Sequence, residues 1–457
     1  MRILLVVPPG RGGRESIVVP PLGLLYLAGS LEKAGYKVQI LDAFAEGLGW
    51  TEFEERVKES KPDVFGIGGM TPVWDLTRRA VEIAHRYAGV VIAGGPHVSM
   101  KGVSILEDEP DIDYAVIGEG EITIVELIKA IESGRTVDSI AGVIGKDGVG
   151  SSSSPVRNLD ELPFPARHLL KSRLYRYPLL GEGTVATIFT SRGCPYSCVF
   201  CDKTVHGSIL REHSVERVLE EIELIVCGED IHSVIIYDDL FTLNKERVIN
   251  ICKGVIDRGI NFRFKCEARV DSVDSEMLYW LGRAGASVVA YGIETVTQHG
   301  LNFLKKGVTP LQIAHALELT RSVGIDSLGY FIVGIPGDTE EDVMENVRFA
   351  RRYHLKWAQF SVLSPTPGTK LFESAEKEGW YAEFSALNPF DKDLKKAALA
   401  DGYWDEERLA RALKKAYRSF YLHPSYLIRR LAGLRSWRNL IQLARTGMDF
   451  IKWLIFK

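Results

Sequence analysis

The feature that most constrains the fold of this 457-residue chain is a repeated alternation of short apolar runs with amphipathic stretches. In residues 1–150 the apolar runs, which we expect to be strands, are Arg2–Val7, Lys37–Leu41, Val64–Gly68, Val90–Ala93 and Tyr114–Ile117. Helical spacing between them covers Leu22–Ala34, Phe53–Ser60, Val73–Tyr87 and Ile122–Ser133. This alternation predicts a doubly wound α/β domain, in which helices cover both faces of a parallel sheet.

A break rich in Ser, Gly and Pro at residues 148–155 ends this first series, and we expect residues 151–184 to form a linker. A second series occupies residues 185–370, and its expected strands are Ala186–Thr190, Ser233–Tyr237, Arg263–Cys266, Val288–Gly292, Ser327–Val333 and Trp357–Ser361. Six strand-helix units predict a partial or full β/α barrel, whose chemistry lies at the carboxyl ends of its strands. The remaining residues, 371–457, have a helical pattern and are expected to form a helical C-terminal segment.

Composition and charge exclude several classes of protein. The chain is 46% hydrophobic and 25% charged, which is typical of folded domains, and its net charge of −4 gives no reason to expect a nucleic-acid partner. The apolar run near Met1 is shorter than a signal-peptide core, and no run of 18 or more apolar residues could span a bilayer. We therefore expect a cytoplasmic protein.

Glycine-rich loops follow three of the expected strands in residues 1–150. They are Gly68-Gly69 with Thr71, Gly94-Gly95-Pro96-His97 and Gly118-Glu119-Gly120-Glu121. Open α/β sheets bind ligands beyond the carboxyl ends of their strands, where helix N-termini favour phosphate, so these loops predict a phosphate-bearing ligand. Ordinary tight turns are the alternative, because no G-x-G-x-x-G pattern opens the first helix.

Three of the six cysteines, Cys194, Cys198 and Cys201, lie within eight residues directly after the first strand of the second series. Six cysteines are too few for a disulfide scaffold, and the other three are expected to be small core residues. Gly193 and Pro195 disfavour a helix, so the three thiols are expected to lie on a loop that binds a metal centre. Zinc would need a fourth ligand, such as His206, whereas a four-iron cluster on three thiolates leaves one iron open to a substrate or cofactor.

The pattern Cys194-x-x-x-Cys198-x-Phe200-Cys201 resembles the signature of the radical S-adenosylmethionine superfamily. The resemblance implies a 4Fe-4S cluster on the three cysteines, whose open iron binds S-adenosylmethionine. It also places Phe200 beside the adenine of that cofactor. The position of the signature, after the first strand of a six-unit β/α series, strengthens the resemblance.

Further motifs resemble one branch of that superfamily, the cobalamin-dependent enzymes with an N-terminal B12-binding domain. Besides the glycine-rich loops they are Pro20-Pro21-Leu22-Gly23, Leu159-Asp160-Glu161-Leu162-Pro163, Tyr237-Asp238-Asp239, Ala268-Arg269-Val270-Asp271, Gly292-Ile293-Glu294 and Gly334-Ile335-Pro336-Gly337, and together they cover roughly residues 1–370. The resemblance implies that residues 1–150 bind cobalamin through Thr71, Gly94, Gly95, His97, Gly118 and Glu119. The D-x-H-x-x-G motif, whose His binds cobalt in many B12 domains, does not occur here, so we expect cobalt without a protein His ligand.

Four residues at strand ends of the second series are expected to bind S-adenosylmethionine. Arg269 suits its carboxylate through the guanidinium fork, and Glu294 suits the ribose hydroxyls. An ion pair between these two residues is the alternative. We expect Asp238 to lie in the active site, with capping of the next turn as its alternative, and Gly334 to let the backbone approach adenosine.

The resemblance implies a C-methyltransferase, in which a 5′-deoxyadenosyl radical removes hydrogen from an unactivated carbon and methylcobalamin supplies the methyl group. No protein acid or base is needed for that step, and none is assigned. The alternative keeps both cofactors but closes or rearranges a ring. A methylthiotransferase is disfavoured because no cysteine precedes Cys194. The expected partners are a small-molecule or lipid substrate and an electron donor such as a flavodoxin or ferredoxin.

The C-terminal residues 408–457 carry 12 Lys and Arg against the single acid Asp449, a net charge of +11. Within them one helical face is apolar, and it comprises Trp437, Ile441, Ala444, Met448, Ile451 and Ile455. Two hypotheses fit this pattern. The helix either packs this face on the barrel, or lies peripherally in a membrane interface with its cations toward anionic lipid.

Overall fold

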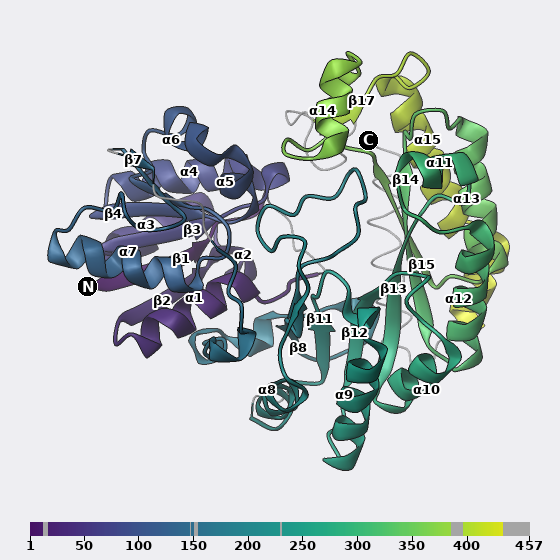
Figure 1. Ribbon diagram of the computed structural model, residues 1–457, viewed down its shortest axis with the longest axis horizontal. Helices are drawn as coiled ribbons and strands as arrows, with labels where there is room; N and C mark the ends of the chain where they lie inside the picture. The colour runs from purple at the N-terminus through teal and green to yellow at the C-terminus, as the bar shows by residue number, and fades with distance from the viewer. Residues whose placement is uncertain (12–16, 147, 150–153, 229–230, 385–395, 433–457) are drawn as a thin grey trace. The chain divides into compact units, whose positions relative to one another are not determined.

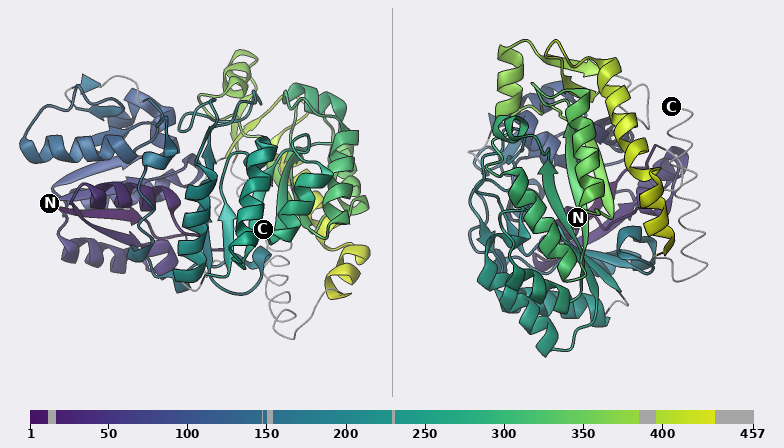
Figure 2. Two further views of the ribbon diagram at one scale, coloured as in Figure 1. Left: turned by 60° about the horizontal axis from the view of Figure 1, so that its bottom comes forward. Right: turned by 90° about the vertical axis from the view of Figure 1, so that its right-hand side faces the viewer.

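The computed structural model describes residues 1–11, 17–146, 148–149, 154–228, 231–384 and 396–432 (Figures 1 and 2). It divides into two compact units. The first unit comprises residues 1–195, 203–239 and 254–264, and the second comprises residues 196–202, 240–253 and 265–457. The boundary therefore falls within the loop that carries the three clustered cysteines and again within a strand of the second series.

A seven-stranded sheet with the order β2-β1-β3-β4-β5-β6-β7 forms the N-terminal part of the first unit (Figure 1). Its strands are β1 (Arg2–Val7), β2 (Lys37–Asp42), β3 (Val64–Gly68), β4 (Val90–Gly94), β5 (Tyr114–Val116), β6 (Val143–Gly145) and β7 (Gly148–Val149). Its helices are α1 (Leu22–Lys33), α2 (Ala43–Glu46), α3 (Trp50–Ser60), α4 (Trp74–His85), α5 (Pro96–Lys101), α6 (Ile105–Asp108) and α7 (Glu121–Ser133). The first five strands are parallel, and β6 and β7 are antiparallel additions.

The central strand β1 is buried on both faces, as its unbroken apolar sequence predicts. Leu4 and Val6 belong to one core with α3 and α4, whereas Ile3 and Leu5 belong to another with α1 and α7. The doubly wound prediction is therefore confirmed. The strand order reverses between β1 and β3, and in such sheets this switch point is where ligands bind.

The second series forms a six-stranded sheet with the order β15-β14-β13-β12-β11-β8. Its strands are β8 (Val185–Ile188), β11 (Ser233–Ile236), β12 (Arg263–Ala268), β13 (Ala286–Glu294), β14 (Asp326–Val333) and β15 (Trp357–Val362). Its helices are α8 (Val215–Gly228), α9 (Lys245–Asp257), α10 (Ser275–Arg283), α11 (Gln298–Phe303), α12 (Pro310–Ser322) and α13 (Glu340–Arg352). The pairs β8–β11, β13–β14 and β14–β15 are parallel, so the predicted partial β/α barrel is confirmed.

The C-terminal segment is not helical throughout. Its helices α14 (Lys370–Lys377), α15 (Glu406–Tyr421) and α16 (Pro424–Ala432) agree with the prediction, but β16 (Tyr381–Phe384) and β17 (Lys396–Leu399) form an antiparallel pair. The helical prediction is wrong there because strand pairing overrides the helix preference of the Ala-rich β17 sequence. The apolar face expected between residues 437 and 455 lies outside the described residues. Among the residues described, no helix is long and apolar enough to cross a membrane.

Helix α15 covers the exposed edge of β15. The hydroxyl of Tyr417 donates to the Phe360 carbonyl (3.0 Å) and accepts from its N–H (3.1 Å), and Tyr421 makes the same two bonds to Ala358 (2.9 and 3.1 Å). These bonds satisfy backbone groups that an edge strand would otherwise leave open.

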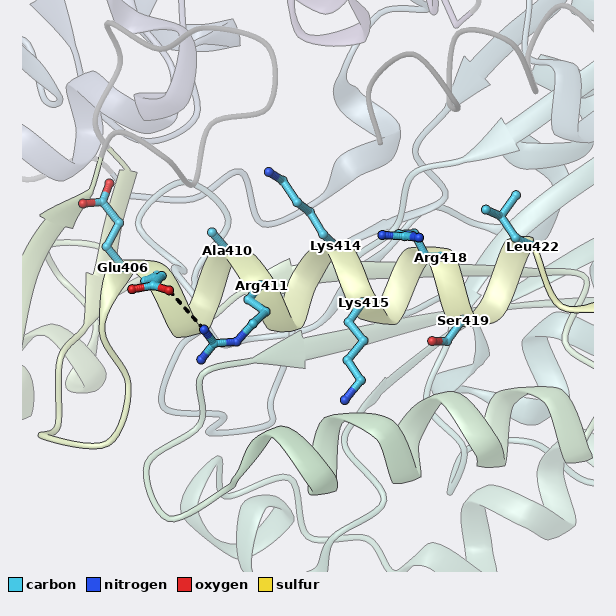
Figure 3. A pocket seen from close by; sticks show the side chains of 9 residues that line it. Glu406, Ala410, Arg411, Lys414, Lys415, Arg418, Ser419 and Leu422 are labelled. Carbon is cyan, nitrogen blue, oxygen red and sulfur yellow. Dashed lines mark hydrogen bonds and ion pairs between the residues drawn. The ribbon is translucent and has the colours of Figure 1, made fainter. Parts of the chain in front are cut away.

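A surface hollow of about 970 Å³ lies along another face of α15 (Figure 3). It is lined by Glu406, Glu407, Ala410, Arg411, Lys414, Lys415, Arg418, Ser419 and Leu422. All of these residues belong to this helix or directly follow it, and none was singled out as a site residue from the sequence. The hollow is therefore not the candidate active site.

Candidate active site

The three clustered cysteines lie on a loop closed by a short antiparallel pair, β9 (Ser191–Arg192) and β10 (Arg211–Glu212). No disulfide involves them, and Cys194 and Cys198 are half-buried while Cys201 is exposed. Gly193 enters the loop with φ +87°, and a side chain there would clash with the carbonyl oxygen of Ile209. The structure therefore presents three thiols that form no disulfide on one constrained loop.

The later part of this loop is anchored to the second unit, to which it belongs. The N–H of Val199 donates to the Leu304 carbonyl (3.2 Å), and the Val199 carbonyl accepts from the N–H of Leu371 (2.9 Å). Val199 belongs to the same buried cluster as Ile332 of β14, and Phe200 packs half-buried against that cluster. Phe200 is thus held beside the cysteines, and its contact with adenine stays a prediction.

Asp238 and Asp239 follow β11 and hold the entrance of the cysteine loop. The buried carboxylate of Asp238 accepts from the Thr190 N–H (2.6 Å) and hydroxyl (2.5 Å) and from the Ser191 hydroxyl (2.7 Å). Asp239 accepts from the N–H of Gly193 (3.0 Å). These bonds tie the end of β11 to the chain that enters the cysteine loop and are not the capping of the next turn that was the alternative for Asp238, and its role toward S-adenosylmethionine stays a prediction.

Arg269, which directly follows β12, is bound on several sides. Its Nε and Nη2 donate to the two carboxylate oxygens of Asp271 (2.8 and 2.9 Å), and Nη2 also donates to the Lys306 carbonyl (2.6 Å). The guanidinium lies over the ring of Tyr196, 3.7 Å from its centroid. Its Nη1 lies 3.9 Å from Sγ of Cys198 and donates to it.

Glu294 ends β13 with φ +66° and is buried. Its carboxylate accepts from Nζ of Lys306 at 2.8 Å, so Glu294 pairs with Lys306 while Arg269 pairs with Asp271. The direct ion pair between Arg269 and Glu294, the alternative weighed from the sequence, does not occur. Binding of the ribose by Glu294 stays a prediction.

Gly334 directly follows β14 in the left-handed conformation, with φ +89°. The left-handed backbone requires glycine here, whereas the contact that a Cβ would make, 2.6 Å from Cδ2 of Leu409 on α15, could be relieved by movement of that side chain. This requirement comes from the chain itself, and the approach of adenosine to Gly334 stays a prediction.

A buried polar group that the sequence analysis missed lies on the same face of β12 as Arg269. Side chains alternate along a strand, so Lys265, Glu267 and Arg269 share this face. Nζ of Lys265, which is only 3% exposed, binds Oε1 of Glu267, and the Tyr330 hydroxyl on β14 donates to the same oxygen (3.3 Å). Gly292 of β13 is opposite Tyr330 in register, and a Cβ at Gly292 would lie 2.6 Å from Oε1 of Glu294 and 2.7 Å from Nζ of Lys306, so the Glu294–Lys306 pair fills the space beside this glycine. The sequence feature that could have revealed this group is the pair of charged residues two positions apart, Lys265 and Glu267, within a predicted strand.

In the first unit, the loops after β3 and β4 come together around His97. Its Nδ1 is 3.1 Å from the Thr71 hydroxyl, and its ring stacks on Trp74 with centroids 4.2 Å apart. Burial lowers the pKa of His97 to about 4, so the imidazole is neutral near pH 7. After β5, the N–H of Gly118 donates to the Ser99 hydroxyl (2.9 Å). The structure thus joins Thr71 to His97 and leaves their contacts with cobalamin as predictions.

Glu119 is surrounded by donors from its own chain. Its buried carboxylate accepts two bonds from Arg211 (2.8 and 2.9 Å), one from the Val156 N–H (2.8 Å) and one from His206 (3.0 Å), and lies 3.4 Å from Arg192. Burial alone would raise the pKa of Glu119, but the bonds from His206 and Arg211 and the charge of Arg192 hold it well below its ordinary value. Glu119 therefore ties the loop after β5 to the cysteine loop, and its expected contact with cobalamin stays a prediction.

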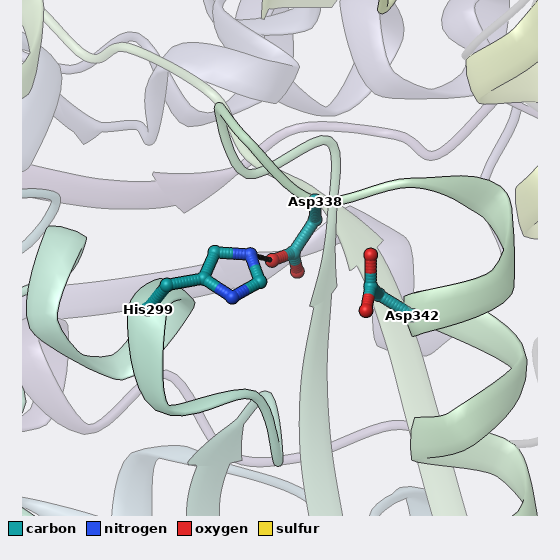
Figure 4. Close-up of side chains that lie close together, drawn as sticks. All are labelled: His299, Asp338 and Asp342. Atoms are coloured by element: carbon teal, nitrogen blue, oxygen red, sulfur yellow. Dashed lines mark ion pairs between the residues drawn. The ribbon is translucent and has the colours of Figure 1, made fainter.

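His299, Asp338 and Asp342 form a separate group in the second unit (Figure 4). Nε2 of His299 is 2.5 Å from Asp338, whose second carboxylate oxygen is buried without a hydrogen-bond partner. Burial raises the pKa of Asp338 to about 6. Asp342 already accepts from the N–H and hydroxyl of Thr339 (both 2.7 Å), which caps α13, so we assign this group as an ion pair beside a helix cap.

Comparison with known proteins agrees with this geometry. Residues 16–128 match the B12 binding domain model, and residues 188–350 match the radical SAM superfamily model. The chain is 34% identical to an uncharacterized methyltransferase of Pyrococcus horikoshii, over 94% of each protein. The chain belongs to the cobalamin-dependent radical S-adenosylmethionine enzymes.

One further sequence relative and one solved structure resemble this chain. The chain is 29% identical to the anaerobic magnesium-protoporphyrin IX monomethyl ester cyclase of Cereibacter sphaeroides, over 92% of this chain and 70% of that protein. The fold of the chain matches that of the radical S-adenosylmethionine methyltransferase TsrM from Kitasatospora setae, which was solved with cobalamin and a [4Fe-4S] cluster. The TM-score is 0.75, and the two proteins are 20% identical over 93% of this chain and 89% of TsrM.

The cofactors of this enzyme are a 4Fe-4S cluster, S-adenosylmethionine and cobalamin. The residues of the structure fit them. Three thiols on one loop, none of them in a disulfide, are the donor set of a cluster with an open iron. At the carboxyl end of β4, Gly94 and Gly95 place backbone without side chains beside the ligand-binding edge of the sheet.

Proposed function

We propose that this enzyme is a C-methyltransferase that moves a methyl group to an unactivated carbon of a small-molecule or lipid substrate. The observation that carries the proposal is the 34% identity, over 94% of each protein, to a protein named as a methyltransferase. When bound, the cofactors supply a radical that removes hydrogen from the substrate carbon and a methyl group on cobalamin that replaces it.

The protein's own residues hold the reactants in place. Cys194, Cys198 and Cys201 bind the cluster, and the bonds of Asp239 and Val199 fix both ends of their loop. Such fixed positions matter because a radical must meet one substrate carbon and no other group. Phe200, Asp238, Glu294 and Gly334 remain the proposed contacts of S-adenosylmethionine, and Thr71, Gly94, Gly95, His97, Gly118 and Glu119 those of cobalamin. Arg269, which the sequence suggested for the carboxylate of S-adenosylmethionine, donates instead to Cys198.

Ring closure or rearrangement without methyl transfer is a second candidate function. The observation that favours it is the 29% identity to the magnesium-protoporphyrin monomethyl ester cyclase, which extends over 92% of this chain. Both functions need the same cofactors, so the product must distinguish them.

The test is an anaerobic incubation of the reduced, cobalamin-loaded enzyme with candidate substrates and S-adenosylmethionine carrying a deuterated methyl group. Mass spectrometry then follows 5′-deoxyadenosine and the label. A product that carries the deuterated methyl group supports the proposal. An altered, unlabelled product formed together with 5′-deoxyadenosine overturns it in favour of ring closure or rearrangement, and Cys198→Ala serves as the inactive control.

An electron donor is also required, because the cluster must be reduced before S-adenosylmethionine is cleaved. We infer a small one-electron carrier such as a flavodoxin or ferredoxin, consistent with the cytoplasmic location expected from the sequence. Comparison of the initial rate of 5′-deoxyadenosine formation with each carrier and with a chemical reductant tests this inference.

A further inference from the structure

We propose that Arg269 is a positioning residue of the iron–sulfur cluster, which donates a hydrogen bond to the Cys198 thiolate and thereby raises the reduction potential of the cluster. This role differs from the clamp on the carboxylate of S-adenosylmethionine that the sequence suggested for Arg269. It requires the cluster that family membership gives, and it does not depend on whether the product is methylated or cyclised.

The guanidinium of Arg269 is fixed by groups of the second unit. Asp271 binds Nε and Nη2 through both carboxylate oxygens, the Lys306 carbonyl takes a further bond from Nη2, and the ring of Tyr196 lies against the guanidinium plane. Since a guanidinium is rigid and planar, these contacts determine where the remaining nitrogen points. That nitrogen, Nη1, is directed at Sγ of Cys198.

The bond to sulfur has a defined electrostatic consequence. Adding an electron to the cluster increases its negative charge, which is spread in part over the cysteine sulfurs. An N–H group that points at one of these sulfurs stabilises the reduced cluster more than the oxidised one and so raises the potential. Arg269 is only 6% exposed, so water screens this interaction weakly.

The clamp hypothesis makes a different demand on the same side chain. A bidentate clamp on a ligand carboxylate uses two N–H groups of the fork, but Asp271 already occupies Nε and Nη2 in this manner. Arg269 would have to release Asp271 before it could bind S-adenosylmethionine through that edge. The two roles therefore predict different effects of substitutions at Arg269 and at Asp271.

The experiment compares wild type, Arg269→Met, Arg269→Lys and Asp271→Asn as full-length, reconstituted proteins under anaerobic conditions. The midpoint potential of the cluster is measured without S-adenosylmethionine by a redox titration followed by electron paramagnetic resonance. Iron per chain and the dissociation constant of S-adenosylmethionine are measured on the same samples.

We expect Arg269→Met to shift the midpoint potential to a more negative value at unchanged iron content, and Arg269→Lys to shift it less. Asp271→Asn removes the counter-charge of Arg269 and should shift the potential in the opposite direction. An unchanged potential in Arg269→Met, together with S-adenosylmethionine affinity weakened at least about tenfold, would establish the clamp and overturn the proposal.

An unchanged potential in all three variants would also overturn the proposal. If Arg269→Met fails to retain iron, the opposed shifts of Arg269→Lys and Asp271→Asn decide, since both variants keep a cation beside Cys198. Shifts of opposite sign support the proposal, and the absence of a shift in both variants contradicts it.

Discussion

Replacing Glu119 by Gln removes the carboxylate that balances two buried arginines. The side chains of Glu119, Arg192 and Arg211 are 1%, 2% and 9% exposed. Removing one partner of a buried ion pair costs about 3–5 kcal/mol, because it leaves an uncompensated charge. Arg192 keeps Glu121 as a partner at 2.6 Å, so Arg211 bears most of the loss and we expect a cost near the lower end, about 3 kcal/mol.

The effect of Glu119→Gln should reach the cysteine loop. His206 and Arg211, which both donate to Glu119, lie on that loop and on the strand that closes it. Loss of their common acceptor loosens the loop, so we expect the variant to retain less iron than wild type. Unfolding in urea under anaerobic conditions, iron analysis and bound cobalamin are the measurements, and Glu126→Gln on an exposed position of α7 is the matched control.

The pH dependence of the stability that Glu119→Gln loses follows from the lowered pKa of Glu119. Its folded pKa is below the ordinary value of 4.5, so its stabilising charge is fully present above that pH and is lost as the pH falls toward the folded pKa. The difference between wild type and Glu119→Gln should therefore be constant near neutral pH. A difference of less than about 1 kcal/mol, or a variant of wild-type stability that has lost cobalamin, would refute the reasoning and favour direct binding of cobalamin by Glu119.

Four further outcomes are expected. Cys198→Ala should lose the cluster and form no 5′-deoxyadenosine, as iron analysis and chromatography would show; full iron content would contradict the cysteine assignment. Glu267→Gln leaves the buried Lys265 without its carboxylate and should cost about 2 kcal/mol in urea unfolding, more than the roughly 1 kcal/mol of Tyr330→Phe, and equal costs would speak against the ion pair. Burial raises the pKa of Asp338 to about 6, so the folded state binds this proton more tightly than the unfolded state and loses the resulting stabilisation as the pH rises. The free energy of unfolding of wild type relative to Asp338→Asn should therefore fall by about 1 kcal/mol from pH ~5.5 to ~8. A constant difference would show that burial does not raise the pKa of Asp338. Electron paramagnetic resonance of the cob(II)alamin form should lack splitting from an axial nitrogen, whereas such splitting, if lost in His97→Gln, would identify His97 as a cobalt ligand.

The strands of both series could be predicted from the sequence because each is a short apolar run with a clear end. Arg2–Val7 and Val64–Gly68 were predicted with the bounds that the structure gives, and the other predicted strands differ by a few residues at most. The short strands β6, β7, β9 and β10 were not predicted. Such runs are buried on both faces of a parallel sheet, so local pattern and tertiary environment agree. The pair β16–β17 was missed because its formation depends on contact between two segments, and neither has a strong strand pattern alone.

The candidate site was predictable only where its chemistry is local in sequence. Three thiols within eight residues define a metal-binding loop without any knowledge of the fold. The group of Lys265, Glu267 and Tyr330 also depends on the order of the sheet, in which one strand separates β12 from β14, and on the register that sets Tyr330 opposite Gly292 of that strand. Register of this kind follows from the packing of the whole sheet, and so the group could not be derived from the spacing of its residues.

Several acidic residues of the sequence motifs accept hydrogen bonds from the chain itself. Asp238 and Asp239 hold the entrance of the cysteine loop, and Glu119 holds its exit through Arg211. The three thiols must lose their protons when they bind iron, and three thiolates close together repel one another, so the loop needs attachments that do not depend on the metal. Carboxylates that accept backbone N–H and guanidinium groups provide such attachments at both ends of the loop. Asp238, Asp239 and Glu119 therefore position the cysteine loop, and this is why substitution of Glu119 is expected to change stability and iron content together.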